Sequence, residues 1–177
     1  MNIDALFSGM AKADASSRGG KVEVGLYTVE LKNILVKEGR DPKKPGSIFV
    51  AEFTFIESDN PNHKPGTTGS QVLRFAWPAT FGHITRLVYA ILGNSDPEAW
   101  APTKANLEDP AKRELAEKYV RAMCGSESAK RELGAEYEDG AFLGVRLRLE
   151  TKLQKTAPKP GQPDGGDFTS YIWSSLP

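Results

Sequence analysis

Lysine and arginine residues gather in two Pro- and Gly-rich segments of this 177-residue chain, EGRDPKKPG and KTAPKPGQPDGG. Cationic side chains on such loops are suited to neutralising phosphate groups, because the phosphates of a nucleic acid form a row of fixed negative charges. Aromatic residues occupy the strand-like segments beside these loops, and an aromatic ring can stack on a flat ligand such as a base. Cations and rings together indicate binding chemistry.

Side chains that would support catalysis are sparse and scattered. His63 and His83 stand far apart in the sequence, without the Cys, His and carboxylate spacing of a metal site. Cys124 follows an apolar stripe, and no neighbouring residue predicts a lowered thiol pKa. The segment KPGTTGS precedes a strand and not a helix, so it lacks the order of a phosphate-binding loop. We therefore expect a non-enzymatic protein with no catalytic residue, no metal and no cofactor.

Composition indicates an ordinary globular protein, with 39% hydrophobic and 26% charged residues. The 23 basic and 23 acidic residues cancel, so a polyanion must be bound by a local patch and not by a global field. The single cysteine excludes an internal disulfide framework. Neither a signal peptide nor a membrane-spanning run is apparent, so we expect a cytoplasmic protein without a membrane partner, in the host cytoplasm if the chain is phage-encoded.

Periodicity predicts the elements that must position these residues. Residues 1–20 read as a short helix or a flexible arm, and residues 21–177 as a single domain. Alternation with a period of two predicts five strands, and helical spacing predicts a helix from Thr80, its N-cap, to Gly93. A polar insertion at about 94–139 is expected to be helical, with Asp109 as a cap. The predicted strands cover residues 22–37, 47–57, 70–77, 140–155 and 168–173.

The strand faces separate a core from a surface. Leu26, Ile34 and Val36 break the alternation of the first strand, which predicts either a β-bulge or coverage on both faces near the strand ends. One face is otherwise expected to hold Tyr27, Val29, Leu31 and Leu35. In the second strand, SIFVAEFTFI, one face is purely apolar. Its rings form either the core or an exposed platform, and the core is favoured because exposed phenylalanines would form a sticky patch. These rings belong to Phe49, Phe53 and Phe55.

Five strands with a helix between the third and fourth match the order of the OB-fold, a partly open five-stranded barrel. The expected fold is therefore mainly β with helices, an OB-fold barrel carrying a helical insertion. OB barrels bind oligonucleotides or oligosaccharides across strands 2 and 3, beside the loops that join strands 1 to 2 and 4 to 5. Those two loops are the basic segments described above.

Several segments also resemble phage-type single-stranded-DNA-binding-like proteins of OB architecture. They are VGLYTVELKNILVKEG, FVAEFTFIESDNPNHKPGTTGSQV, the helix 81–93 that ends AILGN, and GVRLRLETKLQKT with GGDFTSYIW. The resemblance spans about residues 22–173, apart from most of 94–139. It implies single-stranded DNA binding in a phage-like replication or recombination setting. Many such proteins end in an acidic tail that recruits partners, whereas this chain ends SYIWSSLP.

The candidate ligand-binding residues follow from this arrangement. Phosphate contacts are expected from Lys37, Arg40, Lys43, Lys44, Arg74, Arg146, Arg148, Lys152, Lys155 and Lys159. Stacking is expected from Trp77, Tyr171 and Trp173, the last two on an outward face of the final strand. Each has a structural alternative: Trp77 as rim packing, Tyr171 and Trp173 as packing on the insertion, Arg74 as a solvated arginine, and Arg146 and Arg148 as partners of Glu30 and Glu150.

The function we expect is the binding of single-stranded DNA, or of RNA, with little sequence preference. The binding would serve replication, recombination or repair. The alternative is a structural or protein-interaction OB module whose helical insertion contacts a replication or recombination protein, or a second copy of the chain as a homo-oligomer. Neutral total charge favours the alternative, and the basic loops favour nucleic acid. A carbohydrate-binding barrel would use the same rings without needing the lysines.

Overall fold

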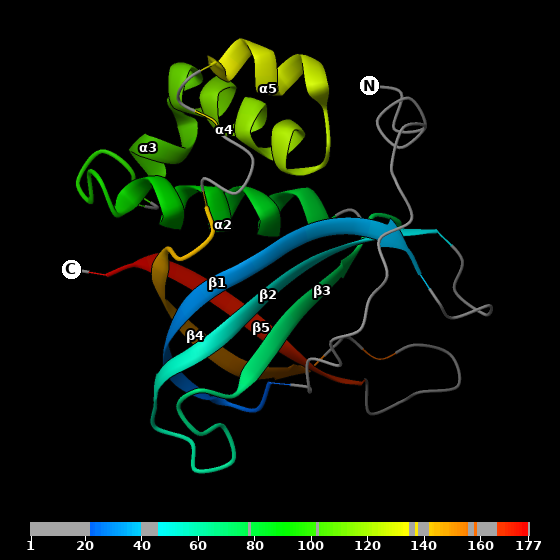
Figure 1. Cartoon of the computed structure of the whole chain (residues 1–177), viewed down its shortest axis with the longest axis vertical. Coiled ribbons are helices and arrows are strands. Elements are labelled where there is room, and N and C mark those ends of the chain that lie inside the picture. Colours follow the sequence, from blue (N-terminus) through cyan, green and yellow to red (C-terminus); the bar gives the residue numbers. More distant parts are fainter. Residues whose placement is uncertain are drawn as a thin grey trace.

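A five-stranded antiparallel sheet and a group of helices make up the protein (Figure 1). The computed structural model describes residues 22–39, 46–77, 79–101, 103–134, 137, 142–155, 158 and 166–176. The strands are hydrogen-bonded in the order β3-β2-β1-β4-β5, so β1 lies at the centre. They are β1 (Gly25–Glu38), β2 (Ser47–Ser58), β3 (Thr68–Arg74), β4 (Arg146–Lys155) and β5 (Asp167–Ser175).

The helices gather at one end of the sheet, and α2 lies between the strands and the other helices (Figure 1). α2 packs against β5 and α4. This arrangement confirms the predicted order of three strands, a helix, a helical insertion and two strands. The helices are α2 (Thr80–Gly93), α3 (Lys104–Glu108), α4 (Pro110–Met123) and α5 (Glu127–Leu133).

A β-bulge in β1 reverses which residues face the core. The pairing with β2 shifts register between Leu31 and Asn33, so one extra residue is accommodated there. Before the bulge Leu31 is fully buried opposite Phe53, and after it Val36 is buried opposite Phe49. The predicted bulge is therefore confirmed. The placement of Leu35 with Leu31 is wrong, because the extra residue turns Leu35 to the outer face.

The row of phenylalanines in β2 forms the centre of the core, as the sequence favoured. Phe49, Phe53 and Phe55 are all completely buried, and Phe53 meets Phe55 edge to face at a centroid distance of 5.5 Å. Gly69 in β3 permits this packing, because a Cβ on Gly69 would lie 2.7 Å from a ring carbon of Phe53. The aromatic row thus requires a residue without a side chain on the neighbouring strand.

The termini of β3 and α2 differ from the prediction. β3 ends at Arg74, and Trp77 lies in the turn that follows, where its backbone N–H donates to the Arg74 carbonyl at 3.0 Å. Thr80 is the first residue of α2 and not its N-cap, which is Ala79; the Thr80 hydroxyl instead donates to the Arg74 carbonyl. The tight turn from strand to helix uses these bonds and leaves the Trp77 ring outside the sheet.

The insertion folds as its sequence predicted. Asp109 caps α4 through its carboxylate, which accepts from the backbone N–H groups of Ala111 and Lys112, and Pro110 occupies the first turn. The apolar stripe of α4 packs inward, with Tyr119, Val120 and Met123 buried. Residues 1–20, the predicted N-terminal arm, lie outside the described residues.

Gly69→Ala should lower the free energy of unfolding by roughly 1–3 kcal/mol, because the buried Phe53 ring cannot move aside. Urea denaturation followed by circular dichroism measures this. Gly82→Ala is the matched control: a Cβ there meets no atom within 4 Å, and alanine in a helix is favoured over glycine by about 1 kcal/mol. Equal effects of the two substitutions would contradict the described packing.

Candidate nucleic-acid interface

Two of the predicted cations meet on the outer face of the sheet. Past the bulge, Lys37 pairs with Ile48 across β1 and β2, and Ile48 pairs with Arg74 across β2 and β3. Residues paired in this way point to the same face. Arg74 reaches back toward the end of β1, since its Nη1 lies 3.4 Å from where a Cβ on Gly39 would be. Lys37 and Arg74 therefore share one end of the three-strand face.

The basic loop between β1 and β2 starts and ends at this same place. The Gly39 N–H donates to the Gly46 carbonyl at 2.9 Å and closes the base of the loop. Arg40, Lys43 and Lys44 belong to that loop and lie outside the described residues, so their role stays a prediction. The described ends of the loop, Gly39 and Gly46, lie at the end of the sheet that carries Lys37 and Arg74.

Trp77 is an exposed aromatic residue in the turn that follows Arg74. Half of its surface is accessible, at 50% relative exposure, and it follows Arg74 by three residues. The Thr80 N–H donates to the Trp77 carbonyl at 3.0 Å and holds the turn. A rigid turn that presents an indole beside an arginine is a suitable stacking platform.

The basic residues of β4 form a second group, which is interleaved with acids. Arg146 Nε lies 3.4 Å from Glu30 Oε2, and Lys152 Nζ lies 2.9 Å from Glu150 Oε1. Hydrogen bonds from Lys32 and Arg146 hold the pKa of the Glu30 carboxyl below its usual value. Arg146 is thus paired with Glu30, which was the structural alternative that the sequence indicated for it. This pairing weakens the β4 row as a phosphate track.

The other two β4 cations have different surroundings. Arg148 is exposed on the outer face and makes no ion pair with any carboxylate of the described residues. Lys155 is exposed at the last position of β4, opposite Asp167. The β4 group pairs with the first half of β1, some seven residues from Lys37, which corresponds to about 24 Å of strand. The two basic groups are therefore separate. Lys159 lies outside the described residues.

The prediction that Tyr171 and Trp173 face outward is wrong. Trp173 pairs with Leu149 on the inner face of β4 and is only 4% exposed. Its indole N–H donates to the Gln71 side-chain oxygen at 2.9 Å, and its ring meets Phe53 edge to face at 5.5 Å. A ring placed in this way has no open face for a base.

Tyr171 points to the same side as Trp173. Its hydroxyl donates to the Ser70 carbonyl at 3.3 Å, and burial raises the pKa of that hydroxyl to about 12. The two side chains of β5 therefore bridge to β3, although the described residues of β3 and β5 share no backbone pairing. Sequence periodicity grouped Tyr171 with Trp173 correctly but assigned the pair to the wrong side of the sheet.

Phe168 is an exposed ring that the sequence did not single out. It is 41% exposed and pairs with Gln154, beside Lys155 at the end of β4. The sequence held one signal for this: in the alternation of β5, Phe168 falls on the opposite face from Trp173. Once Trp173 is inside, Phe168 must be outside.

The remaining reactive side chains have structural surroundings. His63 stacks on Phe55 at 4.8 Å, and its Nε2 accepts from the Glu23 backbone N–H at 2.9 Å. Burial lowers the pKa of His83. Burial also raises the pKa of the Cys124 thiol to about 12. Across the described ranges, no group of three or more metal-ligating side chains is present, and no helix has the length and apolar composition needed to cross a bilayer.

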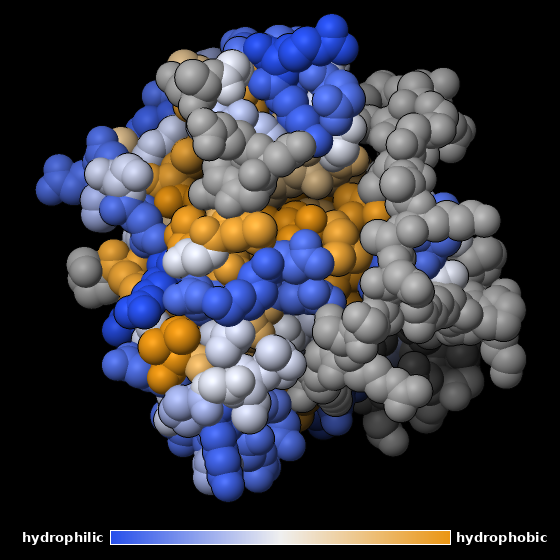
Figure 2. All heavy atoms as spheres, viewed as in Figure 1, coloured by the Kyte–Doolittle hydropathy of each residue, from blue (hydrophilic) through white to orange (hydrophobic). Residues whose placement is uncertain are grey.

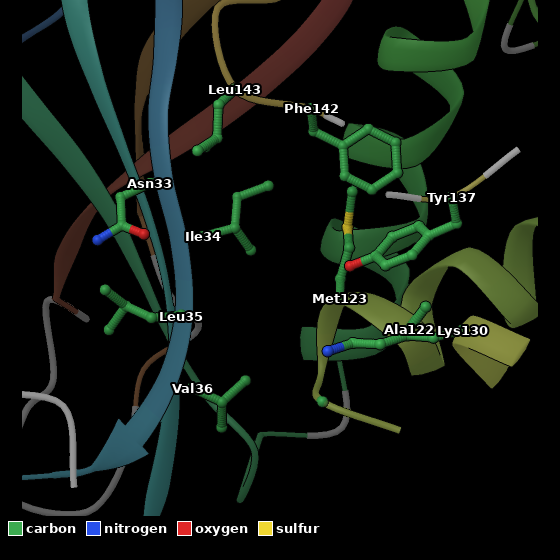
Figure 3. A pocket seen from close by; sticks show the side chains of 11 residues that line it. Asn33, Ile34, Leu35, Val36, Ala122, Met123, Lys130, Tyr137, Phe142 and Leu143 are labelled. Atoms are coloured by element: carbon green, nitrogen blue, oxygen red, sulfur yellow. The ribbon is translucent and has the colours of Figure 1, made fainter. Parts of the chain in front are cut away.

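A cavity of about 330 Å³ lies between β1 and the helical insertion (Figure 3). Ile34 and Val36 project into it from β1, facing Met123, Tyr137 and Phe142. Figure 2 shows apolar side chains gathered in a band where the helices meet the strands on this face. Most of the lining side chains are apolar, and neither Lys37 nor Arg74 is among the lining residues.

No protein-family model matches the chain, and no curated protein sequence matches it.

Trp173→Phe should destabilise the protein by about 1–3 kcal/mol, because the Gln71 side-chain oxygen would remain buried without its donor. Trp77→Phe is the control, with an expected change within about 0.5 kcal/mol for an exposed turn position. Urea unfolding of both variants measures the difference. Tolerance of Trp173→Phe at the level of the control would show that the β3 to β5 bridge is unimportant.

The thiol of Cys124 should be almost unreactive in the folded protein. With a pKa of about 12, the thiolate fraction at pH 8 is on the order of one in ten thousand. Reaction with a chromogenic disulfide should be slow until denaturant is added, after which one thiol per chain reacts, since the sequence has a single cysteine. Rapid reaction in native buffer would contradict the burial of the α4 C-terminus.

Proposed function

We propose that this chain is a non-enzymatic protein that binds single-stranded DNA with little sequence preference, in replication, recombination or repair. The grouping of Lys37, Arg74 and the exposed Trp77 around the base of the basic β1–β2 loop carries the proposal. Phosphates need cations and bases need a flat apolar ring, and this end of the sheet supplies both side by side.

The strand arrangement supports an OB-type barrel as the scaffold. β1 pairs with both β2 and β4, and the side chains of Trp173 and Tyr171 reach across from β5 to β3. An OB barrel is partly open, so side-chain bridges at one seam are compatible with it. In such a barrel the outer face of β2 and β3, where Arg74 lies, is the ligand side.

The geometry changes which rings we assign to bases. Trp77 retains the stacking role, and Phe168 replaces Tyr171 and Trp173 as the aromatic residue near the β4–β5 loop. Arg148, Lys152 and Lys155 would extend phosphate contacts toward that loop; Lys152 is paired with Glu150, whereas Arg148 makes no ion pair among the described residues.

Titration of a labelled oligo-dT across a range of salt concentrations tests the proposal. Affinity should fall steeply with salt, since each phosphate contact on a single strand contributes about 0.7 to the slope of log affinity against log salt. Lys37→Glu should reduce this slope by about one contact or more. Lys104→Glu, at an 86% exposed side chain on α3, is the matched control and should leave it unchanged.

Trp77→Ala should weaken oligo-dT binding by about 1–3 kcal/mol, the usual contribution of one stacked base. Trp77→Phe should retain most of the affinity because the ring is kept. Absence of oligo-dT binding at low salt would refute the proposed function. Binding that is unaffected by Lys37→Glu and Trp77→Ala would leave the function but overturn the site.

A second function, protein interaction through the insertion, is favoured by one observation. The 330 Å³ cavity between β1 and the helices is bordered by Leu143, whose side chain is 47% exposed. Apolar hollows with an exposed apolar rim are typical of sites that receive a hydrophobic side chain. The oligo-dT titration separates the two functions, because this cavity requires no phosphate.

A further inference from the structure

A cleft between α2 and β5 combines an apolar interior with a cationic rim. Its volume is about 250 Å³. Trp100 and Tyr89 form an aromatic wall, with their rings edge to face at a centroid distance of 5.1 Å, and Leu107 and Ile172 complete the apolar lining. Ser174 adds a hydroxyl at the β5 side. The cleft lies apart from the Trp77 turn and from the large cavity beside β1.

One arginine lines this cleft, and a second lies on the strand beside it. Arg86 lines the cleft from α2 and is exposed. Arg148 is not a lining residue, but it lies directly across from the lining residue Ser174 in the β4 to β5 pairing, so these two side chains share one face of the sheet. Neither arginine makes an ion pair with a carboxylate in the described part of the chain. An anion at this rim would therefore not have to displace an acidic side chain.

Acidic residues on the elements around the cleft have other partners. Glu150, opposite the lining residue Ile172, lies 2.9 Å from Lys152 Nζ. Asp96 accepts from the Ala99 backbone N–H at 3.0 Å. Burial, and secondarily the charge of Asp109, raise the pKa of Tyr89, and Asp109 accepts from two backbone N–H groups at the start of α4. The two aspartates serve as caps and do not compete for Arg86. The rim thus remains complementary to a ligand of negative charge.

We infer that this cleft binds one nucleotide of a bound strand, with the base in the apolar interior and the 5′-phosphate between Arg86 and Arg148. The inference rests on the proposed function and deepens it. Arginine donors suit phosphate oxygens, and an aromatic wall with an apolar opposite side suits a flat base. The position is continuous with the outer face of β4, so a strand that follows Arg148 and Lys152 passes the opening.

Calorimetric titration of the full chain with dTMP tests the inference directly. dTMP should bind one site per chain, whereas thymidine and inorganic phosphate, each lacking half of the ligand, should bind at least about tenfold more weakly. Arg86→Glu should weaken dTMP binding by about tenfold or more. Arg131→Glu, at an exposed arginine on α5 that does not line the cleft, is the matched charge control and should have no effect.

The outcomes distinguish this cleft from the proposed function as a whole. Oligo-dT binding without saturable dTMP binding would overturn the cleft and leave the function standing. Loss of both would overturn both. Equal weakening of dTMP binding by Arg86→Glu and Arg131→Glu would mean that only general charge is measured, and would also overturn the cleft. A short acidic aromatic peptide that binds the cleft where dTMP does not would show that the ligand class is wrong.

Discussion

One buried hydrogen bond, from the Trp173 indole N–H to the Gln71 side-chain oxygen, joins the two edge strands of the sheet. β3 and β5 share no backbone pairing among the described residues, so this bond and the packing of Trp173 on Phe53 keep them adjacent. If Trp173 left the interior, Gln71 would lose its partner and the aromatic row of β2 would lose a wall. Arg74 lies on the opposite face of β3 from Gln71. The position of this outer face therefore depends on the bond between Trp173 and Gln71.

The cations of this protein differ in whether an acidic side chain lies beside them, and this matters more than the net charge of the chain. The chain is neutral overall, with 23 basic and 23 acidic residues, yet its cations differ in what they face. Arg146 and Lys152 have carboxylates within 3.4 Å and 2.9 Å. Arg148, which is exposed, has none among the described residues. An exposed cation without an acidic partner contributes most to phosphate binding, because no ion pair must be broken first.

The sequence allowed the strand order and much of the core to be predicted, but not which side of an edge strand is inside. Alternation in β2 identified the Phe49, Phe53 and Phe55 face because one side was purely apolar, and two misplaced apolar residues in β1 revealed the bulge. In β5 the same rule grouped Tyr171 with Trp173 and then chose the wrong side. That choice depends on Gln71, 102 residues earlier in the chain, and no local pattern reports such a partner.

The central claim is that bases meet Trp77 and not the buried Trp173. The chain has three tryptophans, so a ¹H–¹⁵N NMR spectrum should contain three indole N–H signals that single-site substitutions can assign. Addition of oligo-dT should shift the Trp77 signal strongly and that of Trp173, which is hydrogen-bonded in the core and lines only the cleft between α2 and β5, much less. A shift of the Trp173 signal with none at Trp77, or no shift at any indole, would contradict the account.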